Sequence, residues 1–471
     1  MIKFYNTLTR TIQNFVPINK KIVKLYSCGL TVYSQPHIGN WVIYTYWDIL
    51  VRTLRQSGYQ VIHVQNITDV GHLTSDEDSG QDKMLKGVKT EGMTAWGVAD
   101  KYIEIADREA YSLLGLTRPT HMPRATDYIN QQIDFVKQLE SLGYTYKIDD
   151  GIYYDSSKFP TYGELAKLDI SGLRAGARVA NNDKKHPTDF ALWKFSSPGE
   201  KRDMEWDSPW GKGFPGWHLE CSVMAREILG DEIDIHTGGI DHIPVHHTNE
   251  IAQTEAITKT KFSNFWLHGN HLKVNSEKIS KSLGNSITLE DIISKGYSLE
   301  AYKITILSKH YRTEGNFTWD IIEASQNRIS KLNQTLDESL LQPNPDSPIL
   351  DDDYFASSAA EILTHLQNDL DTPGALNYFS SVLDNLELND GVHPSQTKLL
   401  LQFLKAVDAM LGLNFSNRKD INNDQKDLVR LRQEARQDKD WDRSDEIRDK
   451  LLESGIRIRD KKTRQVWHRV S

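Results

Sequence analysis

Four residues from three separate segments of this chain are suited to holding one metal ion. They are Cys28, Cys221, His246 and Glu250. His246 and Glu250 are four residues apart, so a helix over this segment would place both side chains on one face. Two thiolates, an imidazole and a carboxylate are ligands that zinc accepts. The set therefore predicts a zinc site.

The sequence around these residues leaves other ligand sets open. The segments are CGLTVYSQPHIGN (28–40), GWHLECS (216–222) and HTGGIDHIPVHHTNE (236–250). Three further histidines are rival ligands, namely His236, His242 and His247. Structural burial of the cysteines is the other explanation. Because a chain of 471 residues has only 2 cysteines, a disulfide framework is not expected, and a reducing compartment favours metal ligation or catalysis.

The motif His-Ile-Gly-Asn at residues 37–40 is suited to binding phosphate. It lies between a predicted strand and a predicted helix, and a helix start presents free N–H groups to an anion. Gly39 would let a backbone or a base approach closely. His37 and Asn40 would donate hydrogen bonds to a developing phosphoryl charge. A histidine in an ordinary turn is the alternative.

A second motif, KISKS at residues 278–282, places Lys278 and Lys281 in a short polar loop. Lysine is a mobile point charge for triphosphate and suits a loop that closes on the transition state and then opens. A solvated lysine turn is the alternative. Together with the thiol-rich metal site, the two motifs indicate an ATP-using enzyme that binds a thiol through a metal.

Strand and helix patterns surround the first motif. KIVKLYSCGLTVY is typical of a β-branched strand ending at Gly29, WVIYTYWDILVRTLRQSG has the apolar spacing of a helix, and YQVIHVQNITD is typical of a second strand. Such a βαβ unit begins a parallel sheet with a nucleotide site at the strand ends. We expect an α/β fold: a Rossmann-like parallel-sheet catalytic domain with an insertion, then a helical bundle and a small C-terminal mixed α/β unit.

The length of the chain predicts several domains. Single domains typically stop growing near ~250 to 300 residues, so 471 residues should form three or four. The expected segments are 1–110, the first half of the catalytic domain; 111–212, an inserted connective domain; 213–270, its second half; 271–320, with the KISKS loop; 321–415, the helical bundle; and 420–471, the C-terminal unit.

Composition narrows the class of protein. With 38% hydrophobic and 26% charged residues, the chain is typical of a globular protein. A formal charge of -9 argues against coating nucleic acid by bulk attraction, although the stretch from Arg457 to Arg469 is locally basic. No apolar run approaches the roughly 18 residues of a membrane span, and the first residues lack a signal peptide. We expect a cytoplasmic protein with no membrane partner.

These motifs, in this order, resemble those of the cysteinyl-tRNA synthetases, a family of class I aminoacyl-tRNA synthetases. HIGN and KISKS match the paired signatures HIGH and KMSKS. The stretches CGLTVY, GWHLECS, the Gly-Gly and HH-x-N-E block, and KDWDRSDEIRDKLLESGIRIRD match marks of the cysteine-specific family. The resemblance spans essentially the whole chain.

The resemblance implies a role for each candidate residue. One zinc ion per chain would be bound by Cys28, Cys221, His246 and Glu250, with the substrate thiolate as an added ligand. Thr68, Trp217 and His236 would line the cysteine pocket. ATP, with Mg²⁺, would be bound by Gly29, His37, Gly39, Asn40, Gly238, Gly239, Asp241, Lys278 and Lys281. Of these, His37, Asn40, Lys278 and Lys281 would be catalytic.

Three positions depart from the family pattern. Asn40 replaces the second histidine of the first signature, Ile279 replaces methionine in the second, and Thr237 stands where glycine is usual. Asparagine keeps a neutral donor but cannot become cationic, so we expect activity with altered phosphate contacts. Ile279 should pack inward, and Gly238 and Gly239 should still make the close approach.

The implied reaction activates L-cysteine with ATP and transfers it to the 3′ end of tRNA(Cys). Because an apolar pocket separates near-isosteres by only roughly 10- to 200-fold, selection against serine would rest on zinc binding the thiolate. Four protein ligands usually close a zinc site, so Glu250 would bind long or shift. Segment 271–320 would contact the tRNA stem, and the protein would act as a monomer.

The C-terminal unit would bind the anticodon, since RNA is recognised through splayed bases and phosphates. Candidate contacts are Arg436, Asp445, Asp460 and Trp441, with Trp467 as a further stacking residue. For each one, a solvated helix face or a packed tryptophan is the alternative. Two rival functions are a ligase that joins cysteine to an amino sugar, which lacks this unit, and a degenerate synthetase kept as a zinc- or RNA-binding regulator.

Overall fold

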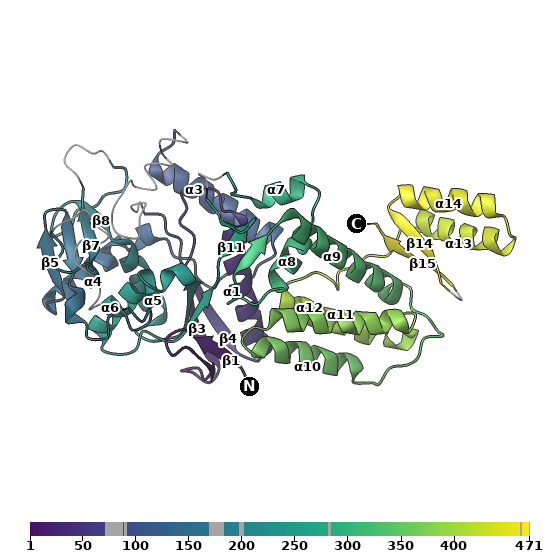
Figure 1. Ribbon diagram of the computed structural model, residues 1–471, viewed down its shortest axis with the longest axis horizontal. Coiled ribbons are helices and arrows are strands. Elements are labelled where there is room, and N and C mark those ends of the chain that lie inside the picture. The colour runs from purple at the N-terminus through teal and green to yellow at the C-terminus, as the bar shows by residue number, and fades with distance from the viewer. Residues whose placement is uncertain are drawn as a thin grey trace. The chain divides into compact units, whose positions relative to one another are not determined.

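A four-stranded parallel sheet lies at the centre of the N-terminal part of the chain (Figure 1). In the computed structural model its strands are β3 (Ile22–Ser27), β4 (Gln60–Gln65), β9 (Ile233–Gly239) and β10 (Ser263–Gly269). Their order is β10-β9-β3-β4, and all three neighbouring pairs are parallel. The predicted α/β fold with a parallel sheet is confirmed.

The structure describes residues 1–70, 88, 92–168, 183–196, 202–280, 284–461 and 464–470. The chain divides into two units. Unit 1 consists of Met1–Leu289 and Tyr311–Asn316, and unit 2 of Glu290–His310 and Phe317–Ser471. The six segments predicted from the sequence are finer than these units and stay a prediction.

Helices of unit 1 connect the parallel strands. Helix α1 (Ile38–Gln56) joins β3 to β4, α5 (Trp217–Leu229) precedes β9, and α6 (His246–Thr258) joins β9 to β10. Every residue of β9 up to Gly238 is buried, as expected for a central strand of a parallel sheet. The connections from β3 and from β9 run in opposite directions, so the strand order reverses between these two strands.

An antiparallel sheet is inserted between the halves of the parallel one. Its strands are β5 (Thr145–Ile148), β6 (Gly151–Tyr154), β7 (Phe190–Phe195) and β8 (Gly213–Pro215), in sequence order. Before it come α3 (Ala95–Asp107), the π-helical turn η1 (Arg108–Leu113) and α4 (Ile129–Ser141). Tyr154 and Trp193 of the insertion share one core cluster with Cys28 and Cys221. The two thiols therefore lie where the insertion meets the parallel sheet.

Two short hairpins complete unit 1. Strands β1 (Lys3–Asn6) and β2 (Thr11–Asn14) form the first, and β11 (Leu272–Val274) and β12 (Glu277–Lys278) form the second. The second hairpin turns at Asn275 and Ser276, whose φ angles are 51° and 66°. Two consecutive residues of positive φ are typical of the tight turn whose twist matches paired strands. This turn positions Lys278 at the end of β12.

Unit 2 is mainly helical (Figure 1). Its helices are α7 (Leu289–Ser294), α8 (Leu299–Leu307), α9 (Trp319–Leu340), α10 (Tyr354–Gln367), α11 (Thr372–Leu388), α12 (Thr397–Leu411), α13 (Asn423–Gln437) and α14 (Trp441–Glu453). An antiparallel pair, β14 (Ile456–Asp460) and β15 (Gln465–Arg469), follows. This confirms the helical and small mixed C-terminal parts of the predicted fold.

The last elements of unit 2 have their own small core. Ile421, Ile447, Leu451, Ile456 and Trp467 form it. Trp467 is 4% exposed, because apolar side chains from α14 and β14 cover its ring. The expectation that Trp467 stacks on RNA is therefore wrong.

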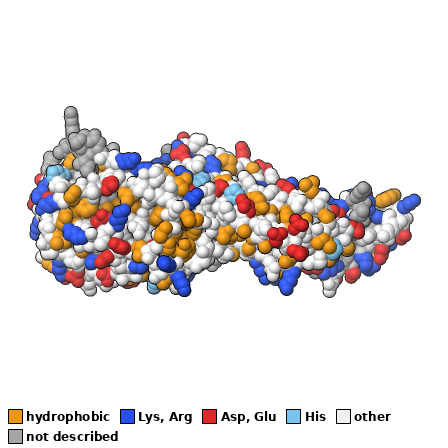
Figure 2. Space-filling model, turned by 90° about the horizontal axis from the view of Figure 1, so that it is seen from below, with side chains coloured by type: hydrophobic (Ala, Val, Ile, Leu, Met, Phe, Trp, Pro, Cys, Tyr) orange, Lys and Arg blue, Asp and Glu red, His pale blue; other side chains and the backbone are white. Residues whose placement is uncertain are grey.

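Acidic and basic side chains are mixed over the face of the molecule seen in Figure 2. This distribution fits the modest formal charge of -9. Among the helices that the structure describes, none has the length and apolar character needed to cross a membrane.

Glu338 is a buried carboxylate that holds the end of α9 against β15. Its oxygens lie 3.1 Å from Lys461 Nζ, 3.4 Å from His468 Nδ1 and 3.4 Å from Arg459 Nη1. Burial opposes ionisation, but hydrogen bonds from His468, Lys461 and Gln334 lower the pKa of Glu338 to about 2. The folded state therefore favours the carboxylate over the acid.

We predict that Glu338→Gln lowers the free energy of unfolding at neutral pH by roughly 3 kcal/mol, the value of such a pKa shift. A lowered pKa stabilises the fold fully above the unfolded pKa of about 4.5 and loses this contribution as pH falls toward 2. Urea unfolding of wild type and variant at several pH values measures it. Glu361→Gln, at a half-exposed carboxylate, is the control. A difference that does not shrink in acid would refute the assignment.

Candidate active site

A cleft of about 600 Å³ opens at the carboxyl ends of β3 and β9. This is the point where the strand order reverses, and in open parallel sheets it is where ligands bind. Most of the residues singled out in the sequence line it: Cys28, Gly29, His37, Gly39, Asn40, Thr68, Trp217, Cys221, Gly238, Gly239, Asp241, His246 and Lys278. His236 and Glu250 are buried, and Lys281 lies outside the described residues.

The four predicted metal ligands converge at the wall of this cleft. One donor atom from each of Cys28, Cys221, His246 and Glu250 lies within 4.8 Å of the other three. Cys28 follows β3, Cys221 is in the middle of α5, and His246 begins α6, which carries Glu250 one turn later. As the i, i+4 spacing predicts, Nε2 of His246 lies 3.0 Å from Oε1 of Glu250.

A second donor set shares two of these residues. Cys28, Glu250, His236 and His247 also bring four donor atoms within 4.8 Å of one another. Nε2 of His247 is 3.3 Å from Sγ of Cys28, and Nε2 of His236 is 2.8 Å from Oε2 of Glu250. The structure thus supports two of the histidine alternatives that the sequence left open. His242, the third, belongs to neither set.

Ionisation differs from one ligand to the next, and burial together with Cys221 raises the pKa of Cys28 well above its usual range. Burial opposes the charge of Glu250, but its interactions with His236 and His246 lower its pKa to about 2. Burial disfavours the charged form of His246 too, yet Glu250 and Cys221 raise its pKa to about 10. Burial alone would raise the pKa of Cys221, but Cys28 and His246 lower it to about 7. A carboxylate and a readily ionised thiol are therefore present in the fold.

The donor chemistry also fits zinc. Zinc–ligand bonds of about 2.0 to 2.3 Å place ligand atoms a few ångströms apart, which four donors within 4.8 Å can reach by small shifts. The remaining histidines support the site from behind: Nδ1 of His246 is 3.0 Å from Nδ1 of His218, and Nδ1 of His247 is 2.7 Å from Nε2 of His268. Such outer contacts fix the orientation of metal ligands.

The His-Ile-Gly-Asn motif forms the first turn of α1. Oδ1 of Asn40 accepts a hydrogen bond of 3.0 Å from the backbone N–H of His37, as in a capping box. The carbonyl end of Asn40 therefore holds its own turn. Its amide N–H group takes no part in this bond, and its donation to a phosphate oxygen stays a prediction.

The two signature motifs contact each other. A Cβ atom at Gly39 would lie 2.8 Å from Cδ1 of Ile279, so a side chain at this position would push the end of Ile279 away. The backbone N–H of Ile38 also donates to the carbonyl of Ile287 at 2.8 Å. Ile279 packs against the start of α1, as expected from its apolar side chain.

The KISKS loop is anchored by Asn285. Its Oδ1 accepts from the backbone N–H of Ser280 at 2.8 Å, and its Nδ2 donates to the carbonyl of Lys278 at 3.0 Å. Lys278 is exposed at the mouth of the cleft. The prediction for Lys281 lies outside the described residues.

The end of β9 forms the floor of the cleft. A Cβ atom at Gly238 would lie 2.6 Å from Nδ1 of His242, so only glycine fits between the strand and this histidine. Thr237, the departure from the family pattern, is buried, and its carbonyl accepts from the backbone N–H of Cys28 at 3.2 Å. Asp241 follows in a short turn and is exposed.

The residues predicted to hold the amino acid surround the metal cluster. The ring centroids of Trp217 and His246 are 4.3 Å apart. Thr68 Oγ1 donates to Oε2 of Glu220 at 3.1 Å and accepts from Nδ2 of Asn66 at 3.0 Å. His236 is buried behind Glu250 and stacks on Trp266 at 4.6 Å. Thr68 and Trp217 line the cleft, whereas His236 acts on it through Glu250.

Glu109 was missed in the sequence. Glu109 lies in the π-helical turn η1 and is only 1% exposed. Oε2 accepts from Nε1 of Trp41 at 2.7 Å, and Oε1 accepts from Nε2 of Gln35 at 3.3 Å. These two residues flank His37, so Glu109 braces both sides of the phosphate motif. Nothing in the spacing of residues 35, 41 and 109 signals this contact.

The four predicted anticodon residues lie on the C-terminal elements of unit 2. Arg436 Nη1 is 3.4 Å from Oδ2 of Asp460, and its guanidinium lies 5.4 Å from the ring of Trp441. Asp445 pairs with Arg448 one helical turn away, at 2.9 Å. Arg436, Trp441 and Asp460 are thus brought together, and Asp445 is exposed on the neighbouring helix face.

Arg432 also belongs to this group of C-terminal residues, although the sequence did not indicate it. It is buried, and both of its terminal nitrogens bond Asp460, at 2.8 and 2.9 Å. The ion pair lowers the pKa of Asp460 through hydrogen bonds from Arg432. Its position in a polar stretch of α13 gave no signal in the sequence.

The fold is that of the class I aminoacyl-tRNA synthetases. The structure is similar to a methionyl-tRNA synthetase of Mycobacterium tuberculosis in complex with methionyl-adenylate, with a TM-score of 0.59 at 14% identity over 83% of this chain and 88% of that one. A putative arginyl-tRNA synthetase from Campylobacter jejuni gives a TM-score of 0.51 at 12% identity, over 86% and 95% of the two chains. At such identities the likeness concerns the fold alone.

Sequence comparison gives the family within this class. Residues 14–327 match the family "tRNA synthetases class I (C) catalytic domain", and residues 418–467 match "Cysteinyl-tRNA ligase anticodon binding domain". The chain is 40% identical to a cysteine–tRNA ligase of Treponema denticola over all of both chains. It is 43% identical to cysteine–tRNA ligase 1 of Burkholderia lata, over 98% and 95% of the two. The chain belongs to the cysteinyl-tRNA synthetase family, whose members are ligases.

We predict that Glu109→Ala weakens binding of a non-hydrolysable ATP analogue about tenfold, because an unbraced motif turn must be ordered on binding. Glu109→Gln keeps an acceptor for Trp41 and should restore most of the affinity. Isothermal titration calorimetry measures both variants. Gln132→Ala, which removes a buried hydrogen bond to Ala125, controls for general loss of packing. Equal loss in the alanine and glutamine variants would contradict a positioning role.

Proposed function

We propose that this enzyme activates L-cysteine with ATP and Mg²⁺ and transfers the cysteinyl group to the 3′ end of tRNA(Cys). The observation that carries the proposal is the convergence of two thiols, an imidazole and a carboxylate beside the nucleotide motifs. The family of the chain supports the substrates. The matched C-terminal domain favours a tRNA over an amino sugar as the acceptor of cysteine.

The first step needs no nucleophile from the protein. The cysteine carboxylate attacks the α-phosphate of ATP, and pyrophosphate leaves. His37, the amide of Asn40 and the lysines of KISKS stabilise the developing charge, and positioning supplies the rest. Asn285 holds the base of the KISKS loop and Glu109 the His37 turn. In the second step, a terminal ribose hydroxyl of the tRNA takes the acyl group.

Selection of cysteine is assigned to the metal cluster. Zinc bound by Cys28, Cys221, His246 and Glu250 would ligate a thiolate far better than a hydroxyl group. The protein's part is to orient these donors and to hold Glu250 ionised, whereas His246 and Cys28 would release a proton when the metal binds. Glu250 is the ligand that can move away to admit the substrate thiolate. Its Oε2 atom stays hydrogen-bonded to His236 when its Oε1 atom separates from His246.

ATP is assigned to the opposite wall of the cleft. His37, Gly39 and Asn40 present the start of α1 to the phosphates, and Gly29, Gly238 and Gly239 line the same cleft. Asp241 is exposed near the mouth of the cleft and would accept hydrogen bonds from the nucleoside. Lys278 and Lys281 complete the set from the KISKS loop.

We predict that the two donor sets respond differently to substitution. His246→Gln should abolish the one-to-one zinc content and lower cysteine-dependent ATP–pyrophosphate exchange by more than about 100-fold, a larger loss than outer-contact substitutions give. His247→Gln should retain zinc. Atomic absorption and the exchange assay measure the two effects on the full chain.

Cys221→Ser tests the origin of selectivity. Because serine is a poor zinc ligand at neutral pH, the variant should lose the metal and much of its preference for cysteine over serine. Ser222→Ala, at the next position of α5, is the matched control. Active enzyme without zinc, or an unchanged preference in Cys221→Ser, would overturn the assignment.

We propose that α13, α14 and the following strands read the anticodon. Trp441 is 54% exposed, and Arg436 lies beside its ring. An exposed indole with a neighbouring guanidinium is a stacking platform for a base. Asp445 and Asp460 offer carboxylate acceptors at its edge.

Trp441→Ala should lower kcat/KM for tRNA in aminoacylation by roughly tenfold or more, since stacking contributes about 1 to 3 kcal/mol per base. Cysteine-dependent pyrophosphate exchange should stay unchanged, because it needs no tRNA. Leu452→Ala, at an exposed apolar residue of the same helix, is the control. Equal aminoacylation by the Trp441 and Leu452 variants would exclude this platform.

A further inference from the structure

His242 is a residue of the catalytic cleft that has no role in the assignments above. It ends the short 3₁₀ turn η5 (Ile240–His242), which lies between β9 and α6, and it lines the cleft. Among the described residues it belongs to neither of the two sets of metal donors. A histidine that lines the cleft without binding the metal is available to the substrates.

The ring of His242 lies between the parts of the cleft assigned to the two substrates. On the cysteine side, its centroid is 5.1 Å from that of His246 and 6.1 Å from that of Trp217, whose ring is nearly perpendicular to it. On the ATP side, a Cβ atom at Gly238 would lie 2.6 Å from Nδ1 of His242. The imidazole thus packs directly on the glycine floor and also contacts the ring of a metal ligand. His242 occupies the boundary between the two substrates.

The protein does not fix the tautomer of His242 through Nδ1. This atom has no hydrogen-bond partner among the described residues, and the partner of the other nitrogen decides where the proton lies. An imidazole carries at least one N–H donor in either charge state. Because Nδ1 is buried against Gly238 while the residue as a whole is half-buried, the edge of the ring that carries Nε2 is left to meet the cleft. An oxygen anion there would draw the proton to Nε2.

The reacting groups must meet at this boundary. The metal cluster would hold cysteine by its sulfur, and the start of α1 would hold the phosphates, so the cysteine carboxylate and the α-phosphate come together between them. Both groups are anionic, and the attack places further negative charge on the oxygens around phosphorus. A donor already in position where this charge develops stabilises the transition state more than the bound substrates. His242 can supply such a donor from the side of the cleft that carries the metal ligands.

We propose that His242 is a further catalytic residue of the first step, and that its Nε2–H group donates a hydrogen bond to the oxygens where the cysteine carboxylate attacks the α-phosphate. This inference rests on the proposed function. In the step, a carboxylate oxygen forms the new bond to phosphorus, and the bond to pyrophosphate breaks with its electron pair leaving on the pyrophosphate oxygen. His242 keeps its proton, because the step neither releases nor consumes one, and its part is to stabilise charge.

His242→Leu tests the assignment on the zinc-loaded full chain. The variant should lower kcat for cysteine-dependent ATP–pyrophosphate exchange by about 100-fold, the usual loss when one such donor is removed. The KM values for cysteine and ATP should change by less than about threefold, because the hydrogen bond forms chiefly in the transition state. Atomic absorption should still find the one-to-one zinc content. A residue that served only the fold or the metal would change the KM values or the zinc content as well.

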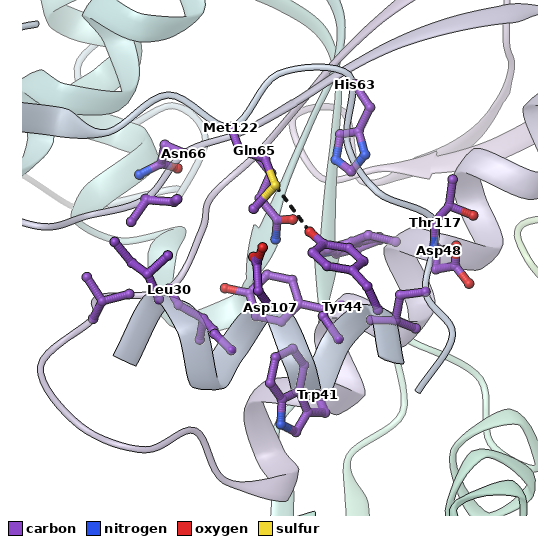
Figure 3. A pocket seen from close by; sticks show the side chains of 18 residues that line it. Leu30, Trp41, Tyr44, Asp48, His63, Gln65, Asn66, Asp107, Thr117 and Met122 are labelled. Carbon is purple, nitrogen blue, oxygen red and sulfur yellow. Dashed lines mark hydrogen bonds between the residues drawn. The ribbon is translucent and has the colours of Figure 1, made fainter. Parts of the chain in front are cut away.

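Two amide substitutions identify the nitrogen that acts. His242→Gln places an amide N–H near the position of Nε2, and His242→Asn places one near Nδ1, so the glutamine variant should regain most of kcat and the asparagine variant should not. His63→Leu is the matched control and should leave kcat unchanged. His63 also has an Nδ1 atom without a described partner, but it lies in a separate cavity of about 60 Å³ (Figure 3), which none of the assigned metal ligands lines.

NMR gives a second measurement that does not depend on activity. In ¹⁵N-histidine-labelled protein, a non-hydrolysable analogue of cysteinyl adenylate should move the Nε2 resonance of His242 toward that of a protonated nitrogen and leave the His63 resonances in place. A His242→Leu variant that keeps the kcat of wild type or loses its zinc, or an Nε2 resonance that bound analogue does not move, would overturn the role of His242. Wild-type protein without cysteine-dependent exchange would refute the proposed function, and NMR would still report whether His242 contacts the ligand.

Discussion

The structure depends on keeping a carboxylate charged in a place that excludes water. Glu250 is fully buried, yet its two oxygens lie 2.8 Å from His236 and 3.0 Å from His246. A buried charge is tolerated only when it is paired and hydrogen-bonded. The partners come from β9 and α6, so the sheet and the helix must meet here to within a few tenths of an ångström. The thiols of Cys28 and Cys221 are held by the same convergence.

Rigidity elsewhere in the cleft comes from small polar contacts rather than charge. Asn40 closes the first turn of α1, Glu109 braces it from η1, and Asn285 ties together the backbone of the second motif. Each of these three side chains forms a hydrogen bond within the protein in place of one to water. Preorganised donors of this kind are what charge stabilisation in a transition state requires, because little reorganisation is left to be done during the reaction.

The sequence predicted those parts of the site that are local or chemically distinctive. The i, i+4 pair of His246 and Glu250 and the strand, turn and helix around His37 follow from periodicity alone, and rare cysteines mark the metal cluster. Long-range partners left no such trace: Glu109, in the π-helical turn η1, contacts Gln35 and Trp41, which are about seventy residues away in the sequence. Burial in the tertiary fold likewise decides between stacking and packing for Trp467.

The bidentate contact between Arg432 and Asp460 bears on the proposed binding of the anticodon. The guanidinium uses one lone pair on each carboxylate oxygen, and a carboxylate has about four such positions. A nucleobase amino group would therefore join an existing ion pair instead of displacing it. Arg432 already fixes the direction of the Asp460 carboxylate. The carboxylate therefore loses little rotational freedom when a base binds to it, because that entropy was lost when the protein folded.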